Sequence, residues 1–471
     1  MRLHPGLPAL CLLALLPRVA RAPNPLSTSA GFGGVADPHV HVFNNTFYLY
    51  STHDLSPEDR GFVDEDWRVF SSPDLLEWTL AATVLPSQTP AAPADYKTCW
   101  ATDAAFRYPF FYFYLSLGSQ QIGVLRGAGP AGPWEDPLGA PLVNASYGRA
   151  LGTEARDPGV FADDDGKFYL VFGTFNYYIA ELAADMVSFA APPAPVVVVN
   201  ATSQNGVGVL DDKPFLHKRA GRYYFSYGGF YGISDSVRGP FQHVGTWLDR
   251  ALIAPDFRIN GTSGPCWCQA ADYNDRHGSF FSAGGQDFWS SNDRSHSADP
   301  FNTNAFRDTI LTYVHYQSDG AIAPVVINAT GVGAYDARHY LEAENFFSLR
   351  GAGRKWHEPG GSRFAVTGLA PASALAFPHV RGAARAVALS IHAAADGAAP
   401  VRAARAVLFA GQAQLCAADL AGAREGAWAD FKCVLEPAWP GEVGSEDLHL
   451  TLTLAGQEAA AVLIDRINFL F

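Results

Sequence analysis

Residues 37–50 read DPHVHVFNNTFYLY: an Asp, a short apolar run, a tight Asn-Asn turn and a burst of aromatic residues. Four later stretches repeat this arrangement behind an Asp or a His, namely residues 103–114 (DAAFRYPFFYFY), 157–170 (DPGVFADDDGKFYL), 212–225 (DKPFLHKRAGRYYF) and 277–289 (HGSFFSAGGQDFW). Asn-Asn, Asp-Gly and Gly-Gly between apolar runs are typical of β-hairpins, because tight turns need backbone angles that these residues tolerate. The stretches therefore predict five related hairpin units.

The spacing of the units indicates how they assemble. They begin at positions 37, 103, 157, 212 and 277, a period longer than the roughly 40 to 50 residues of common propeller repeats. Four-stranded sheets arranged radially protect one another's edges, so five such units close into a ring around a channel. We predict an all-β chain that begins with a five-bladed β-propeller.

The residue that leads each unit is the candidate for chemistry. If the units are related by rotation, the leading residues lie near the axis, on or below the floor of one funnel; they are Asp37, Asp103, Asp157, Asp212 and His277. Carboxylates around one cavity, without a cluster of arginines to neutralise them, raise some of their pKa values and leave others ionised, so a general acid and a general base can coexist. The alternative is that these Asp residues only stabilise turns. Their common register favours the catalytic interpretation.

The leading motifs resemble those of glycoside hydrolase family 43. They are Ala36-Asp37-Pro38-His39-Val40, Trp100-Ala101-Thr102-Asp103, Arg156-Asp157-Pro158-Gly159-Val160-Phe161 and His277-Gly278-Ser279, and the resemblance spans about residues 32 to 335. It implies a five-bladed propeller enzyme that inverts configuration at arabinosyl, xylosyl or, in some branches, galactosyl linkages. It also implies that Asp37 is the general base that activates water, and that Asp157 orients the general acid and raises its pKa.

The same resemblance implies a metal site in the propeller channel. It makes His277 the central histidine that, in many members, faces a calcium or other ion in the channel. A single histidine is a weak metal signal, because calcium takes mostly oxygen ligands, and the alternative is a histidine hydrogen-bonded inside the propeller. We expect that no cofactor is required, and that any calcium ion in the propeller channel is structural.

The fourth motif departs from the family pattern. Where the family usually carries Glu-Gly-Pro, this chain reads Asp212-Lys213-Pro214, which places Asp212 at the position of the general acid. Asp is a methylene shorter than Glu, whereas an inverting site needs its carboxyl groups roughly 6.5 to 9.5 Å apart. Lys213 would also favour an ionised neighbour, which is wrong for an acid. The alternatives are that Asp211 or Glu154 serves, or that the protein binds glycans without cleaving them.

Three residues form the predicted substrate-binding set. Trp100 can stack on the apolar face of a sugar ring, although a Trp packed in the core fits the sequence equally well. Arg294 can donate hydrogen bonds to sugar hydroxyls, although a surface ion pair is the commoner use of an arginine. Asp103, the leading residue of the second unit, completes the set.

The N-terminus carries a secretory signal. An apolar stretch over residues 7–16 follows Arg2, and Ala20-Arg21-Ala22 offers a cleavage site after Ala22. No other apolar run approaches the ~20 residues that span a bilayer, so we expect a secreted, extracellular protein that does not associate with membranes. Five glycosylation sequons fit a eukaryotic secretory route; they begin at Asn44, Asn144, Asn200, Asn260 and Asn328.

The cysteines indicate an oxidising compartment. Cys11 lies in the signal, and Cys416 and Cys433 are close enough in sequence to join one hairpin or loop. Cys266 and Cys268 are separated by one residue and would bridge each other only with strain. We expect Cys99 to pair with one of these two, or all three to be buried thiols.

The composition changes after about Tyr340, as expected of a 471-residue chain that exceeds one core. Alternating runs such as residues 386–391 and 449–454 predict strands despite the high alanine content. Glu342-Ala343-Glu344 and Ile464-Asp465-Arg466-Ile467 resemble carbohydrate-binding modules of family 6, which are β-sandwiches. We therefore divide the chain into a signal peptide (residues 1–22), a catalytic five-bladed β-propeller (residues 23–336) and a β-sandwich resembling such a module (residues 337–471).

Charge and motifs together define two functions. A formal net charge of −13 and an acidic funnel repel phosphate backbones, so we exclude nucleic acid and expect a polysaccharide or oligosaccharide as partner. The first function is a secreted inverting glycoside hydrolase for arabinosyl or xylosyl linkages, with galactosyl linkages also open. The alternative is a catalytically inactive secreted glycan-binding protein, because propellers host many unrelated functions.

Overall fold

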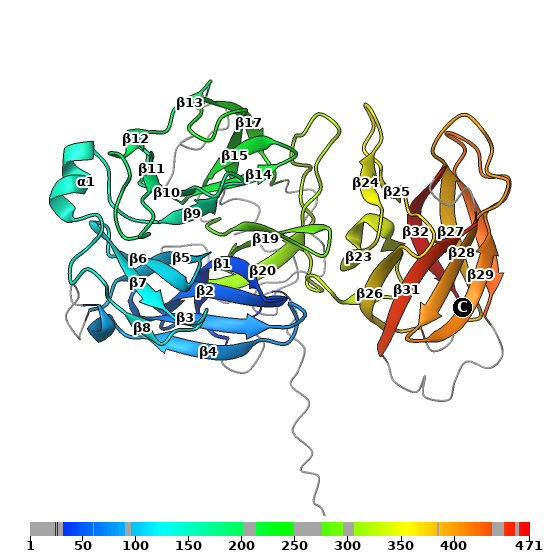
Figure 1. The fold of residues 1–471 in the computed structure, drawn as a ribbon. Coiled ribbons are helices and arrows are strands. Elements are labelled where there is room, and N and C mark those ends of the chain that lie inside the picture. The colour runs from blue at the N-terminus through cyan, green and yellow to red at the C-terminus, as the bar shows by residue number, and fades with distance from the viewer. Residues whose placement is uncertain are drawn as a thin grey trace, which may run out of the picture.

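The computed structural model describes Asn24, Leu26 and residues 32–59, 61–89, 96–200, 213–248, 276–294, 306–383, 386–435, 447–456 and 461–471. These residues form a ring of five sheets and a two-sheet sandwich beside it (Figure 1). The strands are accompanied by α1 (Ala145–Leu151) and the 3-10 segments η2 (Pro86–Gln88) and η5 (Ala343–Asn345). No helix in this part of the chain is both long and apolar enough to cross a bilayer.

Each sheet of the ring is one blade, and its strands pair in chain order. The first blade contains β1 (Val35–Phe43), β2 (Thr46–Asp54), β3 (Asp64–Ser72) and β4 (Thr79–Val84), and the second contains β5 (Cys99–Arg107), β6 (Phe110–Leu117), β7 (Gln121–Gly127) and β8 (Trp134–Glu135). The third contains β9 (Gly159–Ala162), β10 (Phe168–Phe172), β11 (Tyr178–Leu182) and β12 (Ala194–Pro195).

The fourth blade contains β14 (Pro214–Arg219), β15 (Arg222–Tyr227), β16 (Phe230–Ser234) and β17 (Phe241–Thr246), with β13 (Val198–Val199) added in parallel beside β17. The fifth contains β18 (Phe280–Ala283), β19 (Gln286–Asp293) and β20 (Asp308–Tyr313). Each predicted hairpin turn lies between the first two strands of its blade, so the predicted five-bladed propeller is confirmed.

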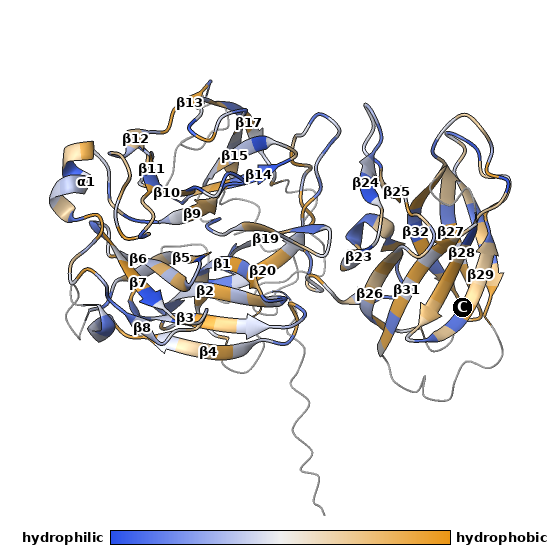
Figure 2. Ribbon diagram, in the orientation of Figure 1, coloured by the Kyte–Doolittle hydropathy of each residue, from blue (hydrophilic) through white to orange (hydrophobic). Residues whose placement is uncertain are grey.

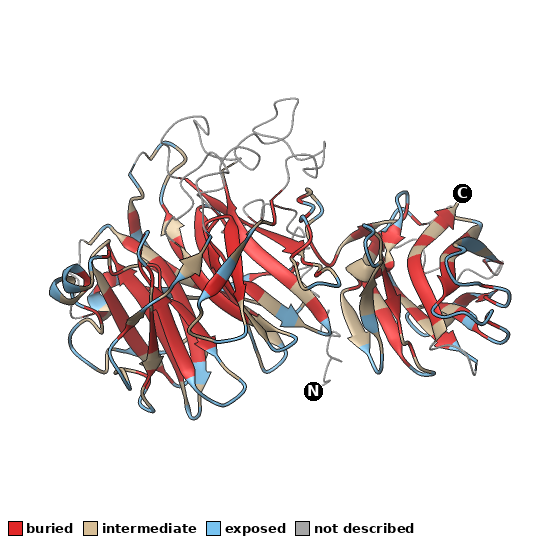
Figure 3. Cartoon of the chain, turned by 90° about the horizontal axis from the view of Figure 1, so that it is seen from above, coloured by how far each residue is buried: buried red, intermediate tan, exposed pale blue. Residues whose placement is uncertain are grey.

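Apolar side chains between neighbouring sheets hold the blades together. One core cluster joins Tyr50 and Trp67 of the first blade to Phe113 of the second, and another joins Val171 of the third blade to Phe225 of the fourth. Figure 2 shows the apolar residues recurring along the strands, and Figure 3 shows how completely these strands are buried. Burial of apolar surface drives folding, so each blade depends on its neighbours.

Asn24 contacts the last blade of the ring. The side chain of Asn24 donates to the carbonyl of Leu311 at 2.8 Å and accepts from its N–H at 2.9 Å. Asn24 therefore pairs with β20 as an additional strand residue would. The start of the described chain is thereby joined to the last blade.

Irregularities at the start of the innermost strands shape the centre of the ring. The register of β1 shifts between Ala36 and His39. Asp37, Asp157 and Lys213 each precede a proline and have positive φ angles of 51°, 54° and 67°. Such bulges re-aim side chains, and positive φ is uncommon for residues other than glycine. The fold thus holds equivalent positions of three blades in one unusual conformation.

The second body is a sandwich of two six-stranded sheets. One sheet contains β21 (Tyr335–Asp336), β26 (Ala374–Arg381), β31 (Asp447–Ala455), β28 (Arg405–Ala410) and β29 (Ala413–Asp419), with β23 (Ser348–Arg350) paired to β26. The other contains β24 (Arg354–His357), β25 (Phe364–Thr367), β32 (Val462–Leu470), β27 (Ala388–Ala395) and β30 (Ala429–Val434), with β22 (Leu341–Glu342) paired to β32. One apolar core lies between the two sheets, which confirms the predicted β-sandwich.

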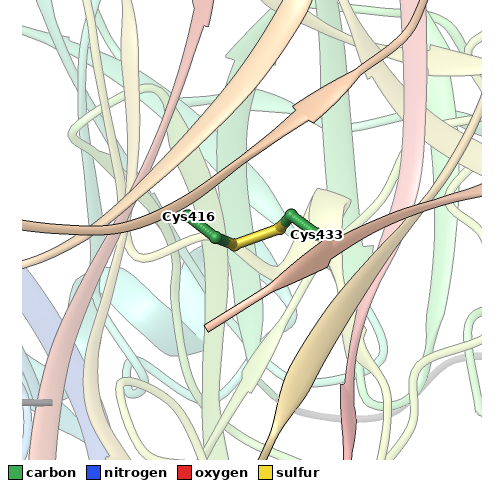
Figure 4. The surroundings of a disulfide bond; sticks show 2 residues. All are labelled: Cys416 and Cys433. Carbon is green, nitrogen blue, oxygen red and sulfur yellow. A yellow bond between two sulfur atoms is a disulfide. The ribbon is translucent and has the colours of Figure 1, made fainter. Parts of the chain in front are cut away.

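A disulfide links the two sheets of the sandwich. Cys416 in β29 is bonded to Cys433 in β30 (Figure 4), and these strands belong to different sheets. The predicted pairing is confirmed, but the expectation that it joins one hairpin or loop was wrong, because the bond crosses the core. Cys99 is a buried free thiol, and burial raises its pKa well above the usual range. Cys266 and Cys268 lie outside the described residues.

Candidate active site

A cavity of about 60 Å³ opens where the innermost strands of the blades meet. It is lined by Asp37, Phe62, Trp100, Arg156, Asp157, Lys213, His277 and Arg307. A single water needs roughly 10–15 Å³, so the cavity has room for a reacting water. Four residues predicted from the sequence therefore meet at one site, namely Asp37, Trp100, Asp157 and His277.

Asp37 is held firmly by one of its two carboxylate oxygens. Its Oδ1 accepts hydrogen bonds from Nη1 of Arg307 at 2.8 Å and Nδ2 of Asn292 at 2.9 Å, and Nδ1 of His277 lies 3.3 Å away. The backbone N–H of Asp37 also donates to Oδ1 of Asn292 at 2.7 Å. All three side-chain contacts use Oδ1, which leaves Oδ2 to face a ligand.

The surroundings of Asp37 keep it ionised. Burial alone would raise the pKa of its carboxyl group, but the charge of Arg307 and the hydrogen bonds from His277 and Asn292 hold that pKa well below its usual range. The sequence showed no cluster of arginines that would neutralise the funnel, but a single arginine, Arg307, engages Asp37 directly. Arg307 directly precedes β20. It lies far in the sequence from every leading motif, and the repeated pattern does not include it.

Arg307 is itself anchored by a buried carboxylate. Its Nε and Nη2 donate to the two oxygens of Asp54 at 2.9 and 2.8 Å, and its backbone N–H donates to Asp54 at 2.7 Å. Its guanidinium carbon lies 4.7 Å from the ring centre of Phe62. The paired hydrogen bonds to Asp54 and the contact with the Phe62 ring fix the plane of the guanidinium group. Its remaining nitrogen, Nη1, is thereby directed at Asp37.

Asp157 lines the same cavity and lies just before the innermost strand of the third blade. Its backbone N–H donates to Oγ of Ser116 at 2.9 Å, and its Oδ2 accepts from the N–H of Lys213 at 3.1 Å. Asp157 therefore contacts the segment that carries the predicted acid. Asp212 itself and the alternative Asp211 lie outside the described residues, so their roles stay predictions. Glu154, the other alternative, is half-buried and 3.0 Å from Arg156 in an ion pair.

His277 connects Asp37 to a second buried cluster. Its Nε2 lies 3.2 Å from Nε2 of His39. Burial would lower the pKa of His277, but its hydrogen bond to Asp37 and the charges of Asp37 and Asp157 raise it. His277 is almost entirely buried, and its ring nitrogens contact side chains rather than bulk solvent.

Asp103 lies below the cavity and has no exposed surface. Its Oδ1 is 2.6 Å from Nε2 of His41 and accepts from the N–H of Ala104 at 2.8 Å, while its Oδ2 accepts from the N–H of Val160 at 2.6 Å. Despite burial, the nearby histidines hold its pKa well below the usual range. This geometry makes Asp103 a link between three blades, whereas the predicted substrate contact would need a ligand to reach a covered side chain.

Of the two remaining residues predicted to bind substrate, one lines the cavity and the other does not. Trp100 lines the cavity, its Nε1 donates to the carbonyl of Phe62 at 3.0 Å, and the Arg156 guanidinium lies 5.5 Å from its ring centre. Arg294 is half-buried just beyond β19 and is not among the residues that line the cavity. Arg156, Lys213 and Arg307 add three cations that the predicted binding set did not include.

The described residues around His277 do not suit a calcium ion. Nδ1 of the ring faces Asp37 and Nε2 faces His39. Calcium takes six to eight oxygen ligands, and the described part of the chain contains no group of three or more His, Cys, Asp or Glu side chains arranged to hold a metal. Asp37, the carboxylate 3.3 Å from Nδ1 of His277, is instead engaged by Arg307.

A cavity lined by one ionised carboxylate, Asp37, and by a second carboxylate, Asp157, has the composition of a glycoside hydrolase site. The chain belongs to the glycosyl hydrolases family 43, whose family model matches residues 30–322. Members of this family hydrolyse O-glycosyl bonds. The matched range ends within the propeller, so the resemblance of residues 337–471 to a carbohydrate-binding module stays a prediction.

Curated proteins of similar sequence are glycosidases by name. The chain is 30% identical over 344 residues to the β-D-galactofuranosidase xynD of Aspergillus niger, covering 68% of this chain and 90% of that protein. It is 31% identical over 261 residues to the arabinoxylan arabinofuranohydrolase of Paenibacillus polymyxa, covering 45% of this chain and 40% of that protein.

Solved structures extend the comparison to the whole fold. A family 43 arabinoxylan arabinofuranohydrolase from Bacillus subtilis, crystallised with cellotetraose, matches 93% of this chain and 95% of its own with a TM-score of 0.52 at 21% identity, which shows the fold alone. A family 43 enzyme from Xanthomonas citri, complexed with xylotriose, matches 66% of this chain and 95% of its own with a TM-score of 0.50 at 26% identity.

Proposed function

We propose that the protein is a secreted, inverting glycoside hydrolase in which Asp37 is the general base, Asp212 the general acid and Asp157 the residue that tunes the acid. The observation that carries the proposal is the environment of Asp37. Its Oδ1 is saturated by Arg307, Asn292 and His277, and its pKa is held low. An ionised carboxylate with one free oxygen at a cavity is what a general base requires.

The contact between Asp157 and Lys213 supports the second half of the mechanism. The N–H of Lys213 donates to Asp157, so the residue before it, Asp212, is connected to the same segment. A charged Asp157 near the acid would raise the pKa of that acid and keep it protonated. Asp37 then deprotonates a water on one face of the anomeric carbon while Asp212 protonates the departing oxygen on the other, which inverts the configuration.

The relatives suggest the sugar. A galactofuranosidase and an arabinofuranohydrolase both act on furanosyl residues by name, and the remaining relatives include xylosidase/arabinosidases. We therefore propose arabinosyl or xylosyl linkages as the principal targets and a galactofuranosyl linkage as a further one. The cavity is small and its aromatic wall is Trp100 and Phe62, which suits a single sugar ring at the end of a chain.

Secretion is part of the same proposal. The predicted signal peptide lies outside the described residues. Three of the predicted glycosylation sites, Asn44, Asn144 and Asn200, are exposed, and Asn328 is half-buried. Asn260 lies outside the described residues. Exposed sequons and a disulfide across the sandwich core both fit an oxidising secretory route.

Proton NMR of reaction mixtures tests the proposal. The protein is incubated with arabinan, arabinoxylan, xylo-oligosaccharides, β-galactan and a galactofuranosyl oligosaccharide, and the first anomer of the released sugar is observed. We expect an inverted anomer, and a rate lower by about 10²–10⁴-fold in Asp37→Asn. Asp164→Asn is the matched control, because Asp164 is an exposed carboxylate on a hairpin turn of the third blade. A retained anomer contradicts the mechanism, and a folded protein that releases nothing supports the glycan-binding alternative.

A further inference from the structure

A histidine that the proposed mechanism does not use lies directly behind the base. His39 is two residues after Asp37 in β1, is completely buried, and points its Nε2 at Nε2 of His277. The two rings are nearly perpendicular, with centres 5.1 Å apart. The contact links the first and fifth blades next to the base.

The backbone around His39 is fixed from the fifth blade. The carbonyl of Pro38 accepts a hydrogen bond from Oγ of Ser290 at 2.7 Å, and the N–H of Val40 donates to Oγ of Ser279 at 2.8 Å. Hydrogen bonds on both sides of a residue restrict its backbone, so the backbone of His39 is held against the fifth blade. The edge of the Phe215 ring, 5.3 Å away between centres, packs against the His39 ring.

Proton balance requires this contact to be a hydrogen bond. An ionised Asp37 only accepts, so Nδ1 of His277 must carry the proton between them. The two Nε2 atoms at 3.2 Å then need one proton between them, which either ring can hold. In both arrangements His277 is bound at both nitrogens, and its ring is held in the orientation that faces Asp37.

The groups on the far side of His39 do not compete for its Nε2. Asp103 lies 3.0 Å from Nδ1 of His39, although this nitrogen lacks an aligned hydrogen bond. Asp103 is satisfied by His41 and by two backbone N–H groups. His277, Asp103 and His41 are the charged or titratable groups that act on His39.

We propose that His39 is the positioning residue of the general base, and that it occupies by its own side chain the place beside His277 where the family resemblance predicts an ion. The proposal rests on the proposed role of Asp37. An ion bound to Nε2 of His277 would have to displace the His39 ring, which is completely buried and packed against Phe215. The support of the base is therefore part of the chain and does not depend on a divalent cation.

Three variants and a metal measurement test this. His39→Phe keeps a ring but removes both nitrogens, and we expect kcat to fall about tenfold or more with KM unchanged, because small misplacements of a reacting group are costly and His39 does not line the cavity. His39→Gln keeps a group that can donate or accept, and we expect it to recover most of kcat. His243→Phe is the matched control, because His243 is a half-buried histidine of β17 that contacts Tyr227 and does not line the cavity, and we expect its kcat to stay within about twofold of that of the unchanged protein.

The metal measurement does not depend on catalytic activity. We expect the purified protein to contain far less than one equivalent of calcium by elemental analysis, and its Tm to be the same with a chelator or with added calcium. One bound equivalent whose removal lowers Tm would overturn the proposal, as would a correctly folded His39→Phe with unchanged kcat. If no glycan is hydrolysed at all, the proposed function fails, while metal content and Tm still decide whether an ion supports His277.

Discussion

Two buried carboxylates of the first blade behave in opposite ways because only one of them reaches Arg307 directly. Asp37 accepts a hydrogen bond from Arg307 and is held ionised. Asp64 is equally buried, but neither of its oxygens accepts a hydrogen bond from a described residue. Burial and the charge of Asp54 raise the pKa of Asp64 well above its ordinary value. A neutral Asp64 can donate a hydrogen bond to Asp54 while Asp54 accepts hydrogen bonds from Arg307.

Asp64→Asn is therefore expected to change how stability depends on pH. The folded state raises the pKa of Asp64 above its unfolded value near 3.9, so the stabilising effect of its protonated form is complete below that value and declines as pH rises toward the folded pKa. The decline is about 1.4 kcal/mol per pH unit for one such group. Asn stays neutral and can still donate to Asp54, so the variant should gain stability relative to the unchanged protein between pH 5 and pH 7.

Urea unfolding at the two pH values measures this difference. Asp66→Asn serves as the control, because Asp66 is partly exposed and pairs with His53 and Arg68. Equal pH dependence in Asp64→Asn and in the unchanged protein would mean that Asp64 is ionised in the folded state.

The sequence predicted the members of this site that belong to the repeat, and missed those that do not. Asp37, Asp157 and His277 lead their units and meet at the cavity. Arg307 and Asp54 follow no motif, and their contact joins residues 253 positions apart. An arginine outside a motif looks the same in a sequence as an exposed one, so only the closure of the ring shows that it faces Asp37.

At the scale of elements, strands and hairpins were predictable but the bulges were not. Alternating aromatic residues and turn residues located the first two strands of each blade. The positive φ of Asp37, Asp157 and Lys213 gave no signal, because nothing in a non-glycine residue predicts it. Lys213 stands where the family motif carries glycine, so this chain accepts a strained lysine at the cavity. The sheet membership of β29 and β30 was equally hidden, which is why the disulfide was expected within one hairpin.

The disulfide between β29 and β30 gives the element-scale prediction. The bond closes a loop with a sequence separation of 17 residues across the sandwich core, and closing a loop of about 15 residues is worth about 3 kcal/mol in the unfolded state. Cys416→Ser/Cys433→Ser should therefore lower the Tm of the protein, and glycosidase activity should be unchanged because neither residue lies in the propeller. Differential scanning calorimetry and the rate of sugar release measure the two effects. Cys99→Ser is the control, and loss of activity in the double variant would show that the sandwich supports the site.

At the scale of the whole molecule, the propeller and the sandwich meet through specific polar contacts. Nζ of Lys355 donates to the carbonyl of Val314 at 2.8 Å, and Nε2 of His315 lies 2.9 Å from Oδ1 of Asn345. A cleft of about 820 Å³ lies beside these contacts, lined from both bodies by residues such as His315 and Arg363. Contacts of this kind cannot be predicted from a sequence, because neither partner belongs to a motif or repeat that marks it as a contact residue. They indicate that the two bodies unfold together.

Gln286 is the residue that tests this coupling. It lies at the start of β19, is completely buried, and its Nε2 donates to the carbonyls of Glu344 at 2.8 Å and Phe346 at 2.6 Å in the sandwich. Gln286→Ala leaves both carbonyls without that donor, at a cost of about 1–3 kcal/mol for each buried group left unpaired. We expect calorimetry to show one transition for the unchanged protein and two for the variant, with activity retained because Gln286 does not line the cavity. Gln317→Ala, a half-buried glutamine on the cleft wall, is the matched control and should keep a single transition. Two transitions already in the unchanged protein would show that the bodies fold independently and that the junction contacts add no cooperativity.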